Sequence, residues 1–170
     1  IDAVRATIDE DEIGDFLPHV RSIIAYNAES KVVETLRMNG VLLSQIAPNG
    51  GIISGSSSVV QLDAWNWEDA VIRYDQGIHL NWPSPYSRSG YSYYRGPSVI
   101  KKSDKYESNV EEIKNFFDSS KAYLNDPNPN PVSLPYKAMS SVFSGNATVF
   151  LHANNEKQIT CLLYTSDAAD

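Results

Sequence analysis

Apolar residues form two runs of strand length in the first half of the chain. One run is Val41–Ala47, which lies between Gly40 and Pro48. The second is GIHLNW at residues 77–82, where apolar and polar positions alternate. Short runs of this kind, bounded by Gly and Pro, are typical of β-strands, so we predict a strand at each place and expect Val41–Ala47 to be buried.

Helical periodicity is clearest in Ser108–Leu124, where Val110, Ile113 and Phe117 form one apolar stripe. Patterns and capping residues predict three shorter helices, at Glu29–Met38, Trp67–Gln76 and Leu134–Phe143. They also predict a buried strand, Ala147–His152, and after it the start of a helix that Asn154 or Asn155 caps. Strands that alternate with helices are typical of a parallel sheet. The pattern therefore predicts an α/β fold with parallel strands.

Two segments have the composition of loops. Asn49–Ser58 contains three glycines and four serines, so we expect a loop there. Pro83–Lys102 is rich in Tyr, Ser, Gly and Pro, and a loop of this length is either functional or an insertion. Its tyrosines could form a lid that binds a sugar or an aromatic group, and a mobile insertion is favoured at least as well.

The composition mainly excludes some classes of partner and location. The 170 residues, 42% of them hydrophobic, suit one globular domain. The formal net charge of −7 argues against a nucleic-acid partner, because such a partner needs a basic surface. No apolar run is long enough to cross a membrane. The composition predicts no particular cellular compartment.

The last ten residues differ from the rest. Cys161–Asp170, CLLYTSDAAD, resembles one reading frame of a common transposase sequencing adapter. We therefore expect residues 1–160 to be the domain and residues 161–170 to be a non-native tail. Since Cys161 is the single cysteine, the domain would then have no disulfide. The chain starts at Ile1 without Met, and we expect it to be a fragment of a longer protein.

His152 is the first candidate for chemistry. It stands at the end of the predicted strand, where α/β barrels place their active-site residues. A neutral imidazole can bind a metal, and a histidine can also act as a general acid or base near neutral pH. Position alone favours a structural histidine, because no His-x-His or HExxH spacing accompanies it.

Four further residues are candidates for substrate binding: His79 and Asn81 at the end of the second predicted strand, Ser54 in the Gly/Ser segment, and Tyr91 in the tyrosine-rich segment. Backbone N–H groups of the Gly/Ser segment could cradle an anion. That segment lacks the Gly-Lys-Ser/Thr ending of a phosphate loop, so a structural turn beside a site is favoured. Its serines have no nucleophile-elbow context, which disfavours a serine hydrolase.

Several segments together resemble the imidazolonepropionase-like members of the metal-dependent amidohydrolase superfamily. The resemblance covers nearly all of residues 1–159 and rests on these stretches: IDAVRAT, SIIAYNAESKV, NGVLLSQIAPNGGIISGSSSVVQLDAWNWEDA, GIHLNWP and VFLHANNEKQI. It implies a (β/α)8 TIM barrel, of which this chain would be a part, from after the first strand to about the fifth. It also implies hydrolysis of C–N bonds, often in cyclic amides, by water that a divalent metal activates.

The resemblance implies a role for one residue in particular. His152, within Leu-His-Ala, matches the fifth-strand metal ligand of the family, and we expect it to bind zinc or a similar ion in the intact parent. The expected partners are a small-molecule substrate and the missing remainder of the barrel. Whether the parent is an enzyme stays open. The alternative is a non-catalytic binding protein on the same barrel, whose tyrosine-rich lid grips a sugar or a peptide.

Overall fold

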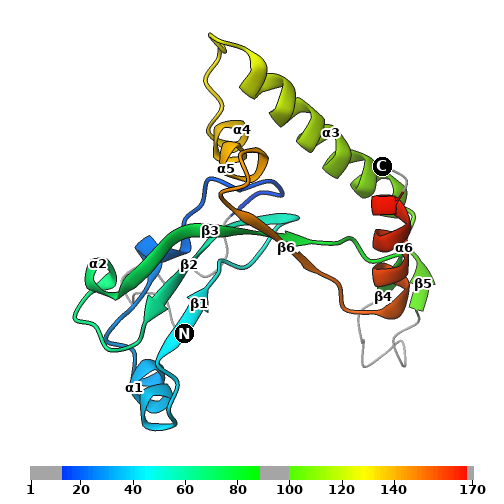
Figure 1. Cartoon of the computed structure of the whole chain (residues 1–170). Coiled ribbons are helices and arrows are strands. Elements are labelled where there is room, and N and C mark those ends of the chain that lie inside the picture. The colour runs from blue at the N-terminus through cyan, green and yellow to red at the C-terminus, as the bar shows by residue number, and fades with distance from the viewer. Residues whose placement is uncertain (1–12, 89–99, 168–170) are drawn as a thin grey trace. The chain divides into compact units, whose positions relative to one another are not determined.

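The computed structural model describes residues 13–88 and 100–167, which form a mixed α/β chain (Figure 1). The chain divides into two compact units, which are described separately. The first unit consists of residues 1–81 and 119–151, and the second of residues 82–118 and 152–170. None of the described helices is both long and apolar enough to cross a membrane.

A curled four-stranded sheet is the main element of the first unit. Its strands lie in the order β1-β2-β3-β6, and their bounds are Leu43–Ile46, Ile53–Gln61, Val71–Asn81 and Thr148–His152. β2 pairs antiparallel with both β1 and β3. The predicted parallel arrangement is therefore wrong for these three strands. The links Ala47–Ile52 and Leu62–Ala70 are shorter than the dozen or so residues that a parallel crossover needs.

The Gly/Ser segment is largely a buried strand, so the predicted loop is wrong from Ile53 onward. β2 is buried from Ile53 to Ser58. This burial is tolerated because its polar side chains form hydrogen bonds inside the sheet. The Ser57 hydroxyl donates to the carbonyl of Gly77 at 3.2 Å. The Ser58 hydroxyl accepts the backbone N–H of Asp75 at 3.0 Å. A segment of serines and glycine can thus form a buried strand when its hydroxyls have hydrogen-bond partners, although its composition is typical of a loop.

One glycine of β2 is required by close packing. Gly55 has a φ of +138°, and a Cβ atom there would lie 2.5 Å from the carbonyl oxygen of Val20 and 2.8 Å from Pro48. Any larger residue would combine an unfavourable backbone conformation with overlap against the neighbouring segment. The backbone N–H of Ser56 donates to the same Val20 carbonyl at 2.7 Å, which holds the two segments together.

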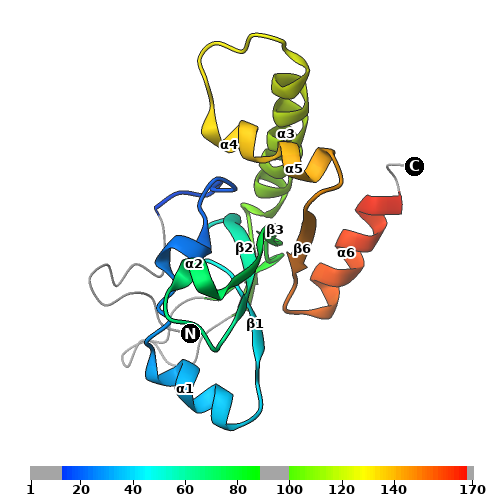
Figure 2. The same cartoon turned by 60° about the vertical axis from the view of Figure 1, so that its left-hand side comes forward.

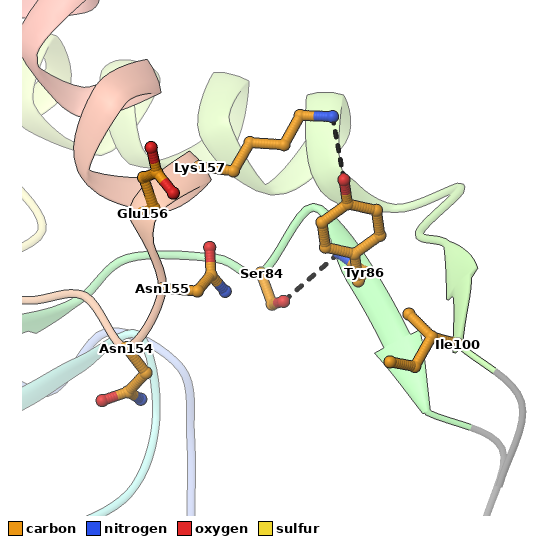
Figure 3. Close-up of a pocket in the computed structure, with 7 residues that line it drawn as sticks. All are labelled: Ser84, Tyr86, Ile100, Asn154, Asn155, Glu156 and Lys157. Atoms are coloured by element: carbon orange, nitrogen blue, oxygen red, sulfur yellow. Dashed lines mark hydrogen bonds between the residues drawn. The ribbon is translucent and has the colours of Figure 1, made fainter.

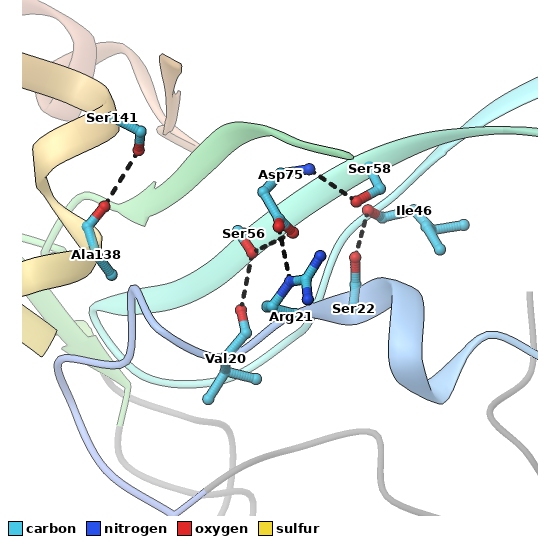
Figure 4. A network of polar contacts seen from close by, with 9 residues as sticks. All are labelled: Val20, Arg21, Ser22, Ile46, Ser56, Ser58, Asp75, Ala138 and Ser141. Carbon is cyan, nitrogen blue, oxygen red and sulfur yellow. Dashed lines mark hydrogen bonds and ion pairs between the residues drawn. The ribbon is translucent and has the colours of Figure 1, made fainter. Parts of the chain in front are cut away.

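A polar network next to Val20 also joins its segment to the sheet (Figure 4). The Arg21 guanidinium donates to the Asp75 carboxylate at 2.6 Å, and the Ser56 hydroxyl donates to the same carboxylate at 3.0 Å. Asp75 has a φ of +44°, and the β2–β3 register shifts nearby, between Ser57 and Val59. Asp75 thus occupies a bulge in β3 that its own side-chain bonds help to hold.

The helical predictions hold in part in the first unit. α1 (Lys31–Met38) begins after Ser30, whose hydroxyl accepts the Val32 N–H at 3.2 Å. The predicted helix Trp67–Gln76 is wrong beyond its first turn. Only α2 (Trp67–Ala70) forms, and it joins β2 to β3 (Figure 2).

β3 replaces the rest of that predicted helix. Val71, Ile72 and Tyr74 are β-branched or aromatic residues that suit a strand. Their pairing with β2, for example Val71 opposite Val60, outweighs the helical spacing of the apolar residues.

The main core of the first unit lies where the 3-10 helix η1 (Ser22–Ala25), α1 and α2 contact the sheet. Its buried members are Ile23, Tyr26, Val33, Val60, Leu62 and Ala70. The two outer strands of the described sheet are exposed: Leu43 on β1 is 56% exposed and Leu151 on β6 is 47% exposed. The prediction that both strands are buried is therefore wrong for the described chain.

The remaining elements largely follow the sequence pattern. α3 (Tyr106–Asn125) confirms the predicted long helix. The predicted helix Leu134–Phe143 is two short helices, α4 (Leu134–Ala138) and α5 (Ser140–Phe143), which meet at the fully buried Met139.

The predicted loop Pro83–Lys102 contains a small antiparallel hairpin in the second unit. Its strands are β4 (Tyr86–Arg88) and β5 (Ile100–Lys102). α6 (Glu156–Asp167) runs across residues 160 and 161, and the adapter origin of residues 161–170 stays a prediction.

Gly55→Ala should lower the free energy of unfolding by about 3 kcal/mol or more, because it adds both backbone strain and a clash. Gly40→Ala is the matched control. Gly40 also has a positive φ, +83°, but a Cβ atom there meets nothing within 4 Å. Its cost should be about 1 kcal/mol. Urea denaturation of both variants measures the difference, and equal costs would contradict the close packing at Gly55.

Tyr26→Phe should stabilise the first unit by about 1 kcal/mol. The Tyr26 hydroxyl is buried and has no hydrogen-bond partner among residues 13–88 and 100–167. Burial also raises the pKa of Tyr26 above its ordinary value of 10.0. Wild-type stability should therefore fall as the pH rises above about 10, because the unfolded chain then loses this proton first. Denaturation from pH 8 to 11 should show this loss in the wild type and a smaller one in the variant.

Candidate functional site

Backbone bonds in the second unit join Trp82, the residue after β3, to the last residue of β6 and to α6. Trp82, which directly follows β3, donates its N–H to the carbonyl of His152 at 2.9 Å. The Trp82 carbonyl in turn accepts from the Gln158 amide at 2.8 Å. These two bonds fix the end of β6 against the first turn of α6. The His152 side chain lies exposed at this strand end.

The first turn of α6 is closed by a reciprocal cap. The Asn155 side-chain oxygen accepts the Gln158 N–H at 2.9 Å, which confirms the predicted Asn155 cap. Gln158, which is 3% exposed, accepts the N–H groups of Asn154 at 2.8 Å and Asn155 at 3.1 Å. This is the geometry of a capping box with Asn and Gln in its two positions. The turn that follows His152 is therefore rigidly built.

A pocket of about 580 Å³ opens beside this turn (Figure 3). It is lined by Ser84, Tyr86, Ile100, Asn154, Asn155, Glu156 and Lys157. The Lys157 ammonium donates to the Tyr86 hydroxyl at 3.0 Å and lies 5.0 Å from the centre of the tyrosine ring. The Ser84 hydroxyl accepts the Tyr86 N–H at 3.2 Å. The hairpin β4–β5 and α6 thus both contribute to the wall.

Two of the predicted substrate-binding residues contact each other in the first unit. The Asn81 amide donates to the Ser54 hydroxyl at 2.9 Å and to the Gly51 carbonyl at 3.0 Å. Ser54 is only 2% exposed. These bonds tie β3 to the start of β2, which is a structural use of both side chains. Their predicted role in substrate binding stays a prediction.

The other two predicted residues have different surroundings. His79 is 8% exposed and stacks on Phe150 of β6, with 5.0 Å between ring centres and 16° between ring planes. Gly77 allows this packing, because a Cβ atom there would overlap Phe150. Tyr91 lies outside the described residues. The lid predicted around Tyr91 is therefore described only at its two ends, β4 and β5.

The described residues do not fit a complete metal site. Across residues 13–88 and 100–167, no three His, Cys, Asp or Glu side chains gather in a group that could hold a metal ion. His152 can supply one imidazole ligand, whereas a catalytic zinc takes three protein ligands. The described part of the chain therefore does not complete a site for the predicted zinc, and no chemical step through a metal follows from it.

Sequence patterns did not single out Ser84 and Lys157. Their contribution depends on the hairpin and α6 coming together, which no local pattern reports. The one available signal was the predicted cap at Asn154 or Asn155, because it places Lys157 in the first turn of a helix that follows a strand.

Comparison with known proteins shows the class of fold. No protein-family model and no curated protein matches the sequence. Among solved structures, the chain is similar to an amidohydrolase from Thermotoga maritima MSB8, with a TM-score of 0.70 and 14% sequence identity. The similarity covers 94% of this chain and 43% of that protein. The chain therefore has an amidohydrolase-like fold and spans less than half the length of the protein that it matches.

The Asn81–Ser54 bond should show measurable coupling in a double-mutant cycle. Asn81→Ala should lower the free energy of unfolding by about 1–3 kcal/mol, because the buried Ser54 hydroxyl and the exposed Gly51 carbonyl both lose their donor. Ser54→Ala in the Asn81→Ala background should cost about 1 kcal/mol less than in the wild type. Additive effects in denaturant unfolding would show that the two side chains do not depend on each other.

Proposed function

We propose that this chain is part of a metal-dependent amidohydrolase that hydrolyses a C–N bond in a small molecule, such as a cyclic amide. The observation that carries the proposal is the fold likeness to the Thermotoga maritima amidohydrolase over 94% of the chain. The resemblance of segments such as GIHLNWP and VFLHANNEKQI to imidazolonepropionase-like proteins supports the closer assignment. A partial (β/α)8 barrel is the architecture that goes with it.

The exposed outer strands support a larger barrel as the working unit. β1 and β6 end the described sheet, and both carry apolar side chains that are about half exposed, Leu43 and Leu151. An exposed apolar edge strand invites pairing with a further strand. We propose that the remainder of the same barrel covers these strands, and that the small-molecule substrate binds only to the complete assembly.

We further propose that His152 supplies one ligand to a divalent metal, zinc, in the intact parent. Its support is the position of His152 at the end of β6, directly before the rigid turn into α6. A bound zinc ion would lower the pKa of a water molecule toward neutrality. At least one further ligand would have to come from outside the described residues, and His79, Asn81, Ser54 and Tyr91 remain proposed substrate contacts.

The test compares His152→Gln with the wild type in the intact parent protein. The substitution should reduce zinc affinity at least about 100-fold, because a ligand is lost, and it should abolish hydrolysis of a panel of cyclic amides. Zinc is measured by mass spectrometry after dialysis against a graded chelator. Unchanged stoichiometric zinc and unchanged hydrolysis in His152→Gln would refute the role of His152.

His19→Gln serves as the matched control, since His19 precedes η1 and belongs to none of the proposed metal or substrate contacts. It should leave zinc content and hydrolysis as in the wild type. An intact parent that binds a sugar or a peptide saturably, but holds no metal and hydrolyses no amide, would instead favour the non-catalytic binding protein.

A further inference from the structure

We infer that the pocket between the β4–β5 hairpin and the first turn of α6 binds a small organic carboxylate. The carboxylate would lie against Ser84, Asn155 and Lys157, and the apolar part of the ligand against the Tyr86 ring and Ile100. This inference concerns binding alone. It requires neither a metal nor hydrolysis, so it goes beyond the proposed function and can fail independently of it.

The walls of this pocket are held in place by bonds that do not involve a ligand. Asn155 is fixed because its oxygen caps α6 through the Gln158 N–H. Tyr86 is fixed at both ends: its N–H donates to Ser84, and its hydroxyl accepts from Lys157. A site built in advance in this way loses little conformational entropy when a ligand binds.

The groups that face the pocket are mainly hydrogen-bond donors. The Asn155 oxygen is occupied by the cap, so its NH2 group is the part of the amide directed toward Ser84 and Tyr86 (Figure 3). The Ser84 oxygen accepts the Tyr86 N–H, and its hydroxyl proton can be donated to a ligand. Lys157 adds a positive charge to the same wall.

One carboxylate, Glu156, also lines the pocket, while the other nearby acceptors are occupied or directed elsewhere. The Gln158 carbonyl oxygen is occupied by the N–H groups of Asn154 and Asn155. The Glu156 side chain runs up along α6, and the Asn154 side chain points to the opposite side from Tyr86 (Figure 3). With the Glu156 side chain directed along α6, the Lys157 ammonium and the neutral donors of Asn155 and Ser84 complement an anion that accepts several hydrogen bonds.

The apolar wall of the pocket determines which kind of anion fits best. The Tyr86 ring and Ile100 offer apolar surface, which suits a hydrocarbon group and is of no use to an inorganic ion. Lys157 and Glu156 together give the lining no net positive charge, which suits a singly charged anion better than phosphate, whose recognition typically uses clustered arginines or several backbone donors. Of the small anions, an organic monocarboxylate therefore fits these groups best.

The experiment titrates the 170-residue chain with benzoate and follows binding by NMR or calorimetry. Benzamide, a neutral molecule of the same shape, and inorganic phosphate are titrated in parallel. Benzoate should bind saturably and at least about tenfold more tightly than benzamide, because only benzoate gains the charge-assisted bonds. Phosphate should bind more weakly than benzoate.

Three variants assign the binding to this pocket. Lys157→Met should weaken benzoate at least about tenfold, and Asn155→Asp, which keeps a capping oxygen but replaces the NH2 donor by a negative charge, should abolish binding. Lys114→Met, on the exposed surface of α3, is the control and should bind as the wild type does. Amide chemical shifts in the NMR spectrum of each variant check that α6 remains folded.

Several outcomes would overturn the inference. They are equal affinity for benzoate and benzamide, tighter binding of phosphate than of benzoate, no saturable benzoate binding, or unchanged affinity in folded Lys157→Met. None of these results bears on zinc binding by His152 in the intact parent. Conversely, a result that refutes zinc binding by His152 would leave benzoate binding to the chain unaffected.

Discussion

The fold of the first unit depends on the antiparallel pairing of β2 with β3. This pairing buries a strand of serines and glycine that would be unstable alone, because each buried hydroxyl needs a partner. Gly77 and Asp75 on β3 supply backbone partners to Ser57 and Ser58. The absence of a side chain at Gly55 lets the Val20 segment approach β2 closely enough to bond.

The pairing also decides which residues are buried. Along β3, the first half is largely exposed, while Ile78 and Leu80 in the second half are buried. The change occurs after the bulge at Asp75, whose positive φ alters the path of the strand. His79 follows in the buried half, stacked on Phe150. Position along this one strand thus determines that His79 is buried against the ring of Phe150.

In the second unit, the arrangement of the residues around the start of α6 depends on one turn. The Asn155–Gln158 cap and the two backbone bonds of Trp82 fix the residues that follow His152. A strand end followed at once by a capped helix is where α/β proteins commonly place chemistry. The proposed metal ligand therefore directly precedes this capped turn, and the turn itself lines the proposed carboxylate pocket.

The sequence by itself determined several helices and, through resembling segments, the amidohydrolase-like fold. The cap at Asn155 and the stripe of α3 were predictable, because helices depend on neighbours within a few residues. The amidohydrolase-like fold was expected from resembling segments. Tertiary structure decided that the Gly/Ser segment forms β2 and that Val71 begins a strand, because strand pairing depends on partners distant in sequence. It also brought Ser84, Tyr86 and Lys157 together, which no local pattern encodes.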